Sequence, residues 1–120
     1  DFGDAVRFGA STAAEDEPDP ARVDLSLPLF SAFARGYLAG ARGLLSELEV
    51  ELLPEACRVV TLELAVRFLT DHIEGDRYFK VERAGHNRER CRSQLALVAA
   101  MERHREAMHA AVRRAREELE

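Results

Sequence analysis

The sequence has no tryptophan, only one lysine (Lys80) and only two cysteines, Cys57 and Cys91, which lie far apart and outside any Cys-x-x-Cys pair. This sparse usage is not that of a disulfide framework, so we expect two free thiols in a reducing compartment, and hence a cytoplasmic protein. No apolar run approaches the roughly 20 residues that span a membrane. The first residues also lack the basic and apolar regions of a signal peptide. We therefore expect no membrane partner.

A basic face is also missing, because 22 acidic residues outweigh 17 basic ones and the formal net charge is -5. The arginines at 113, 114 and 116 are followed at once by glutamates at 117, 118 and 120, which is typical of a solvated helix face. This balance argues against a nucleic-acid partner. The four histidines have neither the spacing nor the cysteine neighbours of a metal site. We therefore assign no metal ligand in this chain.

At 120 residues the chain is one domain or part of one, and its start at Asp1 without an initiator Met suggests a piece of a longer protein. Residues 1–10 fit a short helix or a turn that leads into one. Residues 11–24 are acidic and contain two prolines, so we expect an exposed loop that does not pack. Ser26 is a good N-cap, Pro28 suits a first helical turn, and Gly43 is expected to end the helix that follows.

Further helices follow in the second half of the chain. Ser46 and Glu49 form the Ser-x-x-Glu capping box of a short helix. Pro54 begins a helix that runs to about residue 74, where Gly75 stops it. This helix is apolar over much of its circumference, so we expect it to be central and covered on more than one side.

Residues 76–81 are predicted as a short extended piece, after which Asn87 caps a last helix that reaches the C-terminus. A seam of mostly apolar residues runs along that helix in steps of three and four: Cys91, Gln94, Val98, Met101, Arg105, Met108, Val112, Ala115 and Leu119. We expect the seam to pack on the preceding long helix. The predicted fold class is all-α, with about four helices and one unit over residues 1–120.

Several blocks of the sequence, in order and over nearly its whole length, resemble the N-acetylhexosamine 1-kinase branch of the aminoglycoside-phosphotransferase-like kinases. The first block is the run from Asp1-Phe2-Gly3-Asp4 to Glu17. The later blocks are Glu51-Leu52-Leu53-Pro54, Thr61-Leu62-Glu63, Arg67-Phe68-Leu69-Thr70-Asp71, Glu74-Gly75-Asp76, Tyr78-Phe79-Lys80 and Gly85-His86-Asn87.

The resemblance implies that the chain is the helical C-terminal lobe of a protein-kinase-like fold that uses ATP and Mg²⁺ to phosphorylate the anomeric hydroxyl of an N-acetylhexosamine. The catalytic Asp, the metal-binding Asp and the N-terminal lobe would lie upstream of Asp1. Despite its letters, Asp1-Phe2-Gly3 matches a downstream segment and not the metal-binding one. Because phosphoryl transfer depends on those missing groups, we expect this piece alone to bind neither ATP nor Mg²⁺ and to be inactive.

The resemblance also implies three sugar contacts, Phe8, Arg67 and Tyr78. Spacing alone favours a different role for Arg67, an intrahelical ion pair with Glu63 or Asp71. Tyr78 is equally well interpreted as packing at a helix–loop junction, and Phe8 as a core residue. Relatives also use a tryptophan late in the chain, and this sequence has none.

Two other functions fit the sequence. The first is a kinase of the same fold that acts on an amino alcohol or an aminoglycoside, but such cationic acceptors need carboxylates and Arg67 would repel them. Alternatively, the chain is a non-enzymatic helical module that dimerises through the seam of its last helix, although Arg105 would interrupt such a zipper.

Overall fold

The computed structural model describes all 120 residues, and all its regular elements are helices. The elements are α1 (Phe2–Gly9), the short 3-10 helix η1 (Pro20–Arg22), α2 (Leu27–Gly40), α3 (Glu47–Glu51), α4 (Leu53–Ile73), α5 (His86–Arg103) and α6 (Arg105–Glu117). The predicted all-α class is confirmed. There are six α-helices and not about four, because residues 2–9 form a helix of their own and the last helix is divided in two.

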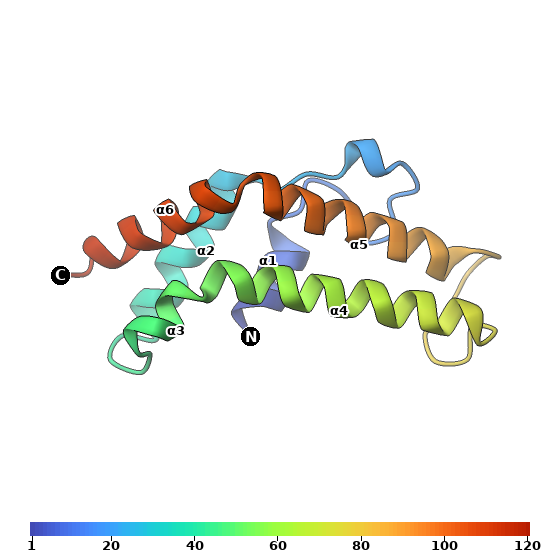
Figure 1. The fold of residues 1–120 in the computed structure, drawn as a ribbon, viewed down its shortest axis with the longest axis horizontal. Coiled ribbons are helices and arrows are strands. Elements are labelled where there is room, and N and C mark those ends of the chain that lie inside the picture. Colours follow the sequence, from blue (N-terminus) through green and yellow to red (C-terminus); the bar gives the residue numbers. More distant parts are fainter.

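The longest helices, α4 and α5, lie side by side and antiparallel, joined at one end of the molecule by residues 74–85 (Figure 1). The chain then continues as α6, which packs against α2, while α1 packs against α4. The molecule is therefore elongated, with extents of 51 × 26 × 19 Å. The α4–α5 loop stands at one tip, remote from the C-terminus (Figure 1).

The buried side chains form two clusters. The larger lies where α1, α2, α5 and α6 meet the start of α4, and it includes Phe30, Met108 and Cys57. The smaller lies near the tip, where Phe68 of α4 packs with Cys91 of α5 and Phe79 of the loop. Both cysteines are free, as expected, and burial raises the pKa of Cys57 to about 12. The α4–α5 loop packs on the small cluster through Phe79.

The predicted helix boundaries have a clear chemical basis in the structure. The Ser26 hydroxyl accepts a hydrogen bond from the Leu29 N–H at the start of α2. Ser46 and Glu49 form both hydrogen bonds of the capping box at the start of α3. Pro54 lies in the first turn of α4. These starts were predicted correctly, but α2 ends at Gly40, and Gly43 occupies the turn that follows.

Residues 11–24 differ from the exposed, unpacked loop that we predicted. The loop is closed at its base, where the Ser26 N–H donates to the Ala10 carbonyl at 2.8 Å. Ser93 and Gln94 of α5 donate side-chain hydrogen bonds to carbonyls of the loop. Val23 is buried. Hydrogen bonds to its backbone carbonyls and the burial of Val23 therefore help to anchor this segment. Its composition predicts solvent exposure and nothing more.

The last helix also differs from the prediction. It begins at His86 with Gly85 as its N-cap, in the left-handed conformation (φ 77°), so Asn87 lies inside the helix and is fully buried. It bends at His104, where its neighbour changes from α4 to α2. The apolar residues of the predicted seam from Cys91 to Ala115 are buried within the chain on both sides of the bend, Leu119 is half-buried, and the Arg105 side chain is largely exposed.

As expected, α4 is covered on more than one side, by α5 and by α1, but its outer face is open. The exposed apolar residues there follow three- and four-residue steps: Val59, Leu62, Val66, Leu69 and Ile73. The predicted extended piece at 76–81 consists of bends without strand pairing. None of the helices combines the length and the apolar character that crossing a membrane requires.

Candidate functional site

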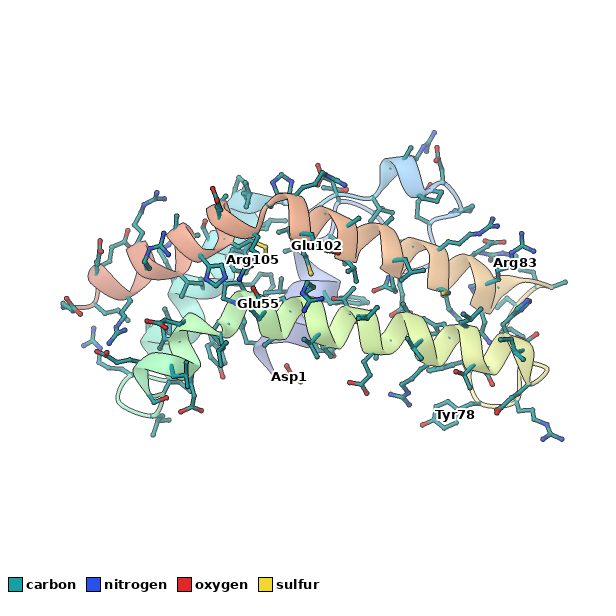
Figure 2. The ribbon with its side chains drawn as sticks, in the orientation of Figure 1. Asp1, Glu55, Tyr78, Arg83, Glu102 and Arg105 are labelled. Carbon is teal, nitrogen blue, oxygen red and sulfur yellow. The ribbon has the colours of Figure 1, made fainter.

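An open cavity of about 220 Å³ lies at the C-terminal end of α4, beside the start of the α4–α5 loop. Its lining comes from one face of the last two turns of α4 and from two aromatic residues of the loop: Arg67, Thr70, Asp71, Glu74, Tyr78 and Phe79. In Figure 2 the Tyr78 side chain lies beside α4, on the side of that helix that faces away from α5. The cavity therefore combines a cation, two carboxylates, two hydroxyls and two aromatic rings in a small solvent-accessible space.

The guanidinium of Arg67 lies over both aromatic rings. Its central carbon is 5.5 Å from the centre of the Tyr78 ring and 5.6 Å from that of Phe79. These distances are within the range of cation–π attraction. The two rings meet edge to face at 4.9 Å, and Phe79 packs on Phe68 of the small core cluster. Two of the residues predicted from the sequence, Arg67 and Tyr78, are thus neighbours in space.

No ion pair joins Arg67 to Glu63 or Asp71, so the structural alternative raised by the spacing is not realised. The Asp71 carboxylate accepts instead from the backbone N–H groups of Tyr78 at 2.7 Å and Phe79 at 3.1 Å. Burial acts to raise the pKa of Asp71, but the N–H groups of Tyr78, Phe79 and Arg77 and the Asn87 amide outweigh it, so that the pKa is lowered. Asp71 is therefore a carboxylate at neutral pH that holds the loop.

The third predicted residue, Phe8, lies apart from this cavity. It is 75% exposed on α1 and is not among the cavity's lining residues. The alternative that Phe8 is a core residue is therefore wrong. Its apolar ring remains available to a ligand or to another part of the protein.

A larger hollow, of about 630 Å³, lies between α6 and the start of α4. Most of its lining side chains are charged, and some of them form ion pairs: Glu55 with Arg105 at 2.7 Å, seen close together in Figure 2, and Glu47 with Arg116 at 2.7 Å. The hydrogen bond from Arg105, with those from His109 and Arg58, lowers the pKa of Glu55 to about 2 against the opposing effect of burial. Because both of these arginines are already held in ion pairs, whereas Arg67 has no ion pair, the smaller cavity at the tip is the better candidate site.

Sequence reasoning did not single out Phe79, Asp71 or Glu74 as site residues, although all three lie in the blocks that carry the family resemblance. The available signal was Asp71, an acidic residue on the buried side of α4. No group of three or more His, Cys, Asp or Glu side chains is placed to hold a metal ion. No protein-family model matches the chain, so the kinase resemblance stays a prediction from the residues quoted above.

Proposed function

We propose that the chain is the C-terminal helical part of a cytoplasmic, ATP-dependent sugar kinase, and that the cavity at the tip is part of its acceptor pocket. The observation that supports this proposal is the position of Arg67 over the Tyr78 and Phe79 rings beside an open cavity. The resemblance implies that Arg67 and Tyr78 both contact the sugar, and the α4–α5 loop brings the two together.

The chemistry of the cavity suits an N-acetylhexosamine. A pyranose has an apolar face that packs on an aromatic ring, and the Tyr78 ring is 74% exposed. The guanidinium of Arg67 carries several N–H donors for sugar hydroxyls or for the carbonyl of the N-acetyl group. The Glu74 carboxylate can accept from a further hydroxyl. Phe8 would contribute to the pocket wall only if a further part of the protein brought the sugar within its reach.

The chain's share in the reaction would be to position the acceptor. In the proposed kinase, the missing N-terminal lobe and the segment that follows it bind ATP and Mg²⁺ and supply the base that accepts the proton of the anomeric hydroxyl. Orienting two reactants accounts for a large part of such a rate enhancement. Orientation alone produces no turnover without the catalytic groups, so we expect the 120-residue chain alone to be inactive.

A kinase of the same fold that acts on a cationic amino alcohol or aminoglycoside is the nearest alternative. Glu74 favours such an acceptor, but Asp71 is occupied by the loop and Arg67 repels a cation. With one free carboxylate against one guanidinium, the cavity favours a neutral sugar.

The test is phosphate transfer from ATP to N-acetylglucosamine and N-acetylgalactosamine by the kinase rebuilt with its upstream half. We expect Arg67→Ala to raise the KM for the sugar roughly 10- to 100-fold, the effect of losing hydrogen bonds from a charged donor. Arg88→Ala, at an exposed position of α5, is the matched control and should behave as the unaltered enzyme.

Three other results would be informative. Equal kinetics for Arg67→Ala and the unaltered enzyme would assign Arg67 a structural role and remove the cavity from the acceptor pocket. Turnover of amino alcohols but not of sugars would favour the alternative acceptor. No turnover with any hydroxyl compound would reject the kinase proposal.

A further inference from the structure

The start of the α4–α5 loop is held by a buried hydrogen-bond network that includes the backbone N–H of Tyr78. At its centre is Asp71, whose Oδ1 accepts from the Tyr78 N–H and whose Oδ2 accepts from the Phe79 N–H and, at 2.7 Å, from the Asn87 amide. The side chain is only 3% exposed, and no cation lies within ion-pair distance. The hydrogen bonds to N–H groups are therefore what stabilises the buried charge.

The amide of Asn87 completes the network. Its Nδ2 donates to Asp71 and, at 3.0 Å, to Asp76, and its Oδ1 accepts from Arg90 Nη1 at 2.9 Å. All the main hydrogen-bonding capacity of this fully buried side chain is thus used. Arg90 in turn lies over the Phe68 ring, 5.6 Å from its centre. The network connects α5 to the loop and rests on the small core cluster.

The backbone at the end of α4 is also held by specific hydrogen bonds. The Asp76 N–H donates to the Asp71 carbonyl at 2.8 Å and the Gly75 N–H donates to the His72 carbonyl at 3.3 Å, which is the Schellman pattern of a helix end. Gly75 and Asp76 both have positive φ, 94° and 60°. For Asp76 this conformation is uncommon, and its hydrogen bond from Asn87 helps to hold it. The chain therefore reverses direction within two residues and leaves α4 toward Tyr78.

The Tyr78 side chain itself is weakly restrained. Its ring is exposed and contacts only Phe79 and Arg67 among the aromatic and cationic neighbours. The position of the ring over the cavity is therefore set mainly by its backbone, and the backbone is fixed where the N–H groups of Tyr78 and Phe79 meet Asp71. A loss of those two hydrogen bonds would free the ring without removing any atom from the cavity's rings or its guanidinium.

We propose that Asp71 and Asn87 are positioning residues, which hold residues 76–79 in the conformation that places Tyr78 beneath Arg67 and so define the geometry of the sugar pocket. This inference rests on the proposed function for its consequence in catalysis, but not for the positioning itself. Neither residue needs to touch the sugar.

The positioning is tested first in the 120-residue chain by NMR. Asp71→Asn keeps the size of the side chain but replaces one acceptor oxygen by a donor amide that faces an N–H group. We expect the Tyr78 and Phe79 amide protons to exchange with solvent at least about tenfold faster, while the amides in the middle of α4 keep their protection. The nuclear Overhauser contact between the Arg67 side chain and the Tyr78 ring should disappear. Glu63→Gln, an exposed acid-to-amide change on α4, is the control and should alter neither signal.

The consequence is tested in the rebuilt kinase. Asp71→Asn should raise the KM for the N-acetylhexosamine about tenfold and leave the KM for ATP unchanged, because a misplaced acceptor contact weakens sugar binding alone. A general loss of stability would not raise the KM for the sugar while leaving the KM for ATP unchanged. If Asp71→Asn does not fold, Asp76→Gly serves instead, since it removes the Asn87 contact while suiting the positive φ; it should give the same changes to a smaller degree.

Unchanged amide exchange and an unchanged Arg67–Tyr78 contact in folded Asp71→Asn would overturn the positioning role. Loosened amides with an unchanged sugar KM would overturn its link to the acceptor pocket. An unaltered kinase that turns over no sugar would overturn the proposed function, and the NMR comparison would still decide the positioning role on its own.

Discussion

Two glycines in helices, Gly3 and Gly36, differ in the space around them. A Cβ added at Gly3 would lie 2.8 Å from the Ala56 carbonyl oxygen and 3.1 Å from Val60 Cγ1, because α1 crosses α4 at this point. A Cβ added at Gly36, inside α2, would meet nothing within 4 Å. The same substitution therefore has opposite effects at the two sites.

We expect Gly36→Ala to stabilise the chain by about 0.5–1 kcal/mol, the usual gain from replacing glycine in an exposed helix interior. Gly3→Ala should destabilise it by about 1–3 kcal/mol, because the backbone of α4 must move away from the new methyl group. The measurement is the free energy of unfolding in urea, followed by far-ultraviolet circular dichroism. If Gly3→Ala stabilised the chain, α1 and α4 would lie farther apart at this point than in the structure.

At this scale the candidate site was only partly predictable from the sequence. Arg67 and Tyr78 are polar or aromatic residues in blocks with a family resemblance, and the structure brings them together. Phe79 is indistinguishable in sequence from a core phenylalanine, because its position in the cavity depends on the chain reversal at Gly75 and Asp76. Asn87 had the sequence properties of an N-cap, and only the packing of α5 on α4 shows that it is a buried partner of Asp71.

At the scale of the elements, the sequence predicted where the helices start better than it predicted which elements each helix packs against. Ser26, Ser46 and Pro54 act within one turn of the backbone, so their effect can be seen in the sequence. The bend at His104 has no proline or glycine to mark it. It occurs where the helix leaves α4 and begins to pack on α2, which is a property of the tertiary structure. Long-range packing likewise orders the acidic loop at residues 11–24.

The contact between α4 and α6 depends on Glu55, in the first turn of α4, and gives a pH prediction. The folded-state pKa of Glu55 is about 2, against an ordinary value of 4.5. A lowered pKa means that the stabilisation is fully present above about pH 4.5 and is lost as the pH falls toward 2. We expect Glu55→Gln to lower the melting temperature at pH 7 by roughly 2–5 °C, since the group is partly solvated and the effect of such pairs is small.

The decisive comparison is between pH 7 and pH 2.5. The difference in melting temperature between the unaltered chain and Glu55→Gln should shrink markedly at the lower pH, where Glu55 begins to be protonated. Glu51→Gln, at the exposed end of α3, should show no comparable pH-dependent difference. A difference that stays constant from pH 7 to pH 2.5 would contradict the ion-pair explanation.

At the scale of the whole molecule, the position of the apolar seam bears on the dimerisation hypothesis. That hypothesis needs the apolar seam of the last helix to be free for a partner chain. The seam is buried within the molecule, with Met101 and Met108 in the same core cluster as Phe2 and Phe30. The apolar face that is open belongs to α4. A dimer formed through the α5–α6 seam would therefore require the chain to give up its own core.

A seam buried in the core and a seam that forms a dimer interface predict opposite results for Val112→Asp. If the seam were a dimer interface, the substitution would yield a folded monomer. Val112 is instead 2% exposed in the core, and an unpaired carboxylate there should cost about 3–5 kcal/mol, a large part of the stability of a small domain. We expect the helical circular dichroism signal to be largely lost at 37 °C. The same change at Val66, on the open face of α4, should leave the chain folded because the new carboxylate remains in water. A folded, monomeric Val112→Asp beside a dimeric unaltered chain would restore the dimerisation hypothesis and place the seam on the surface.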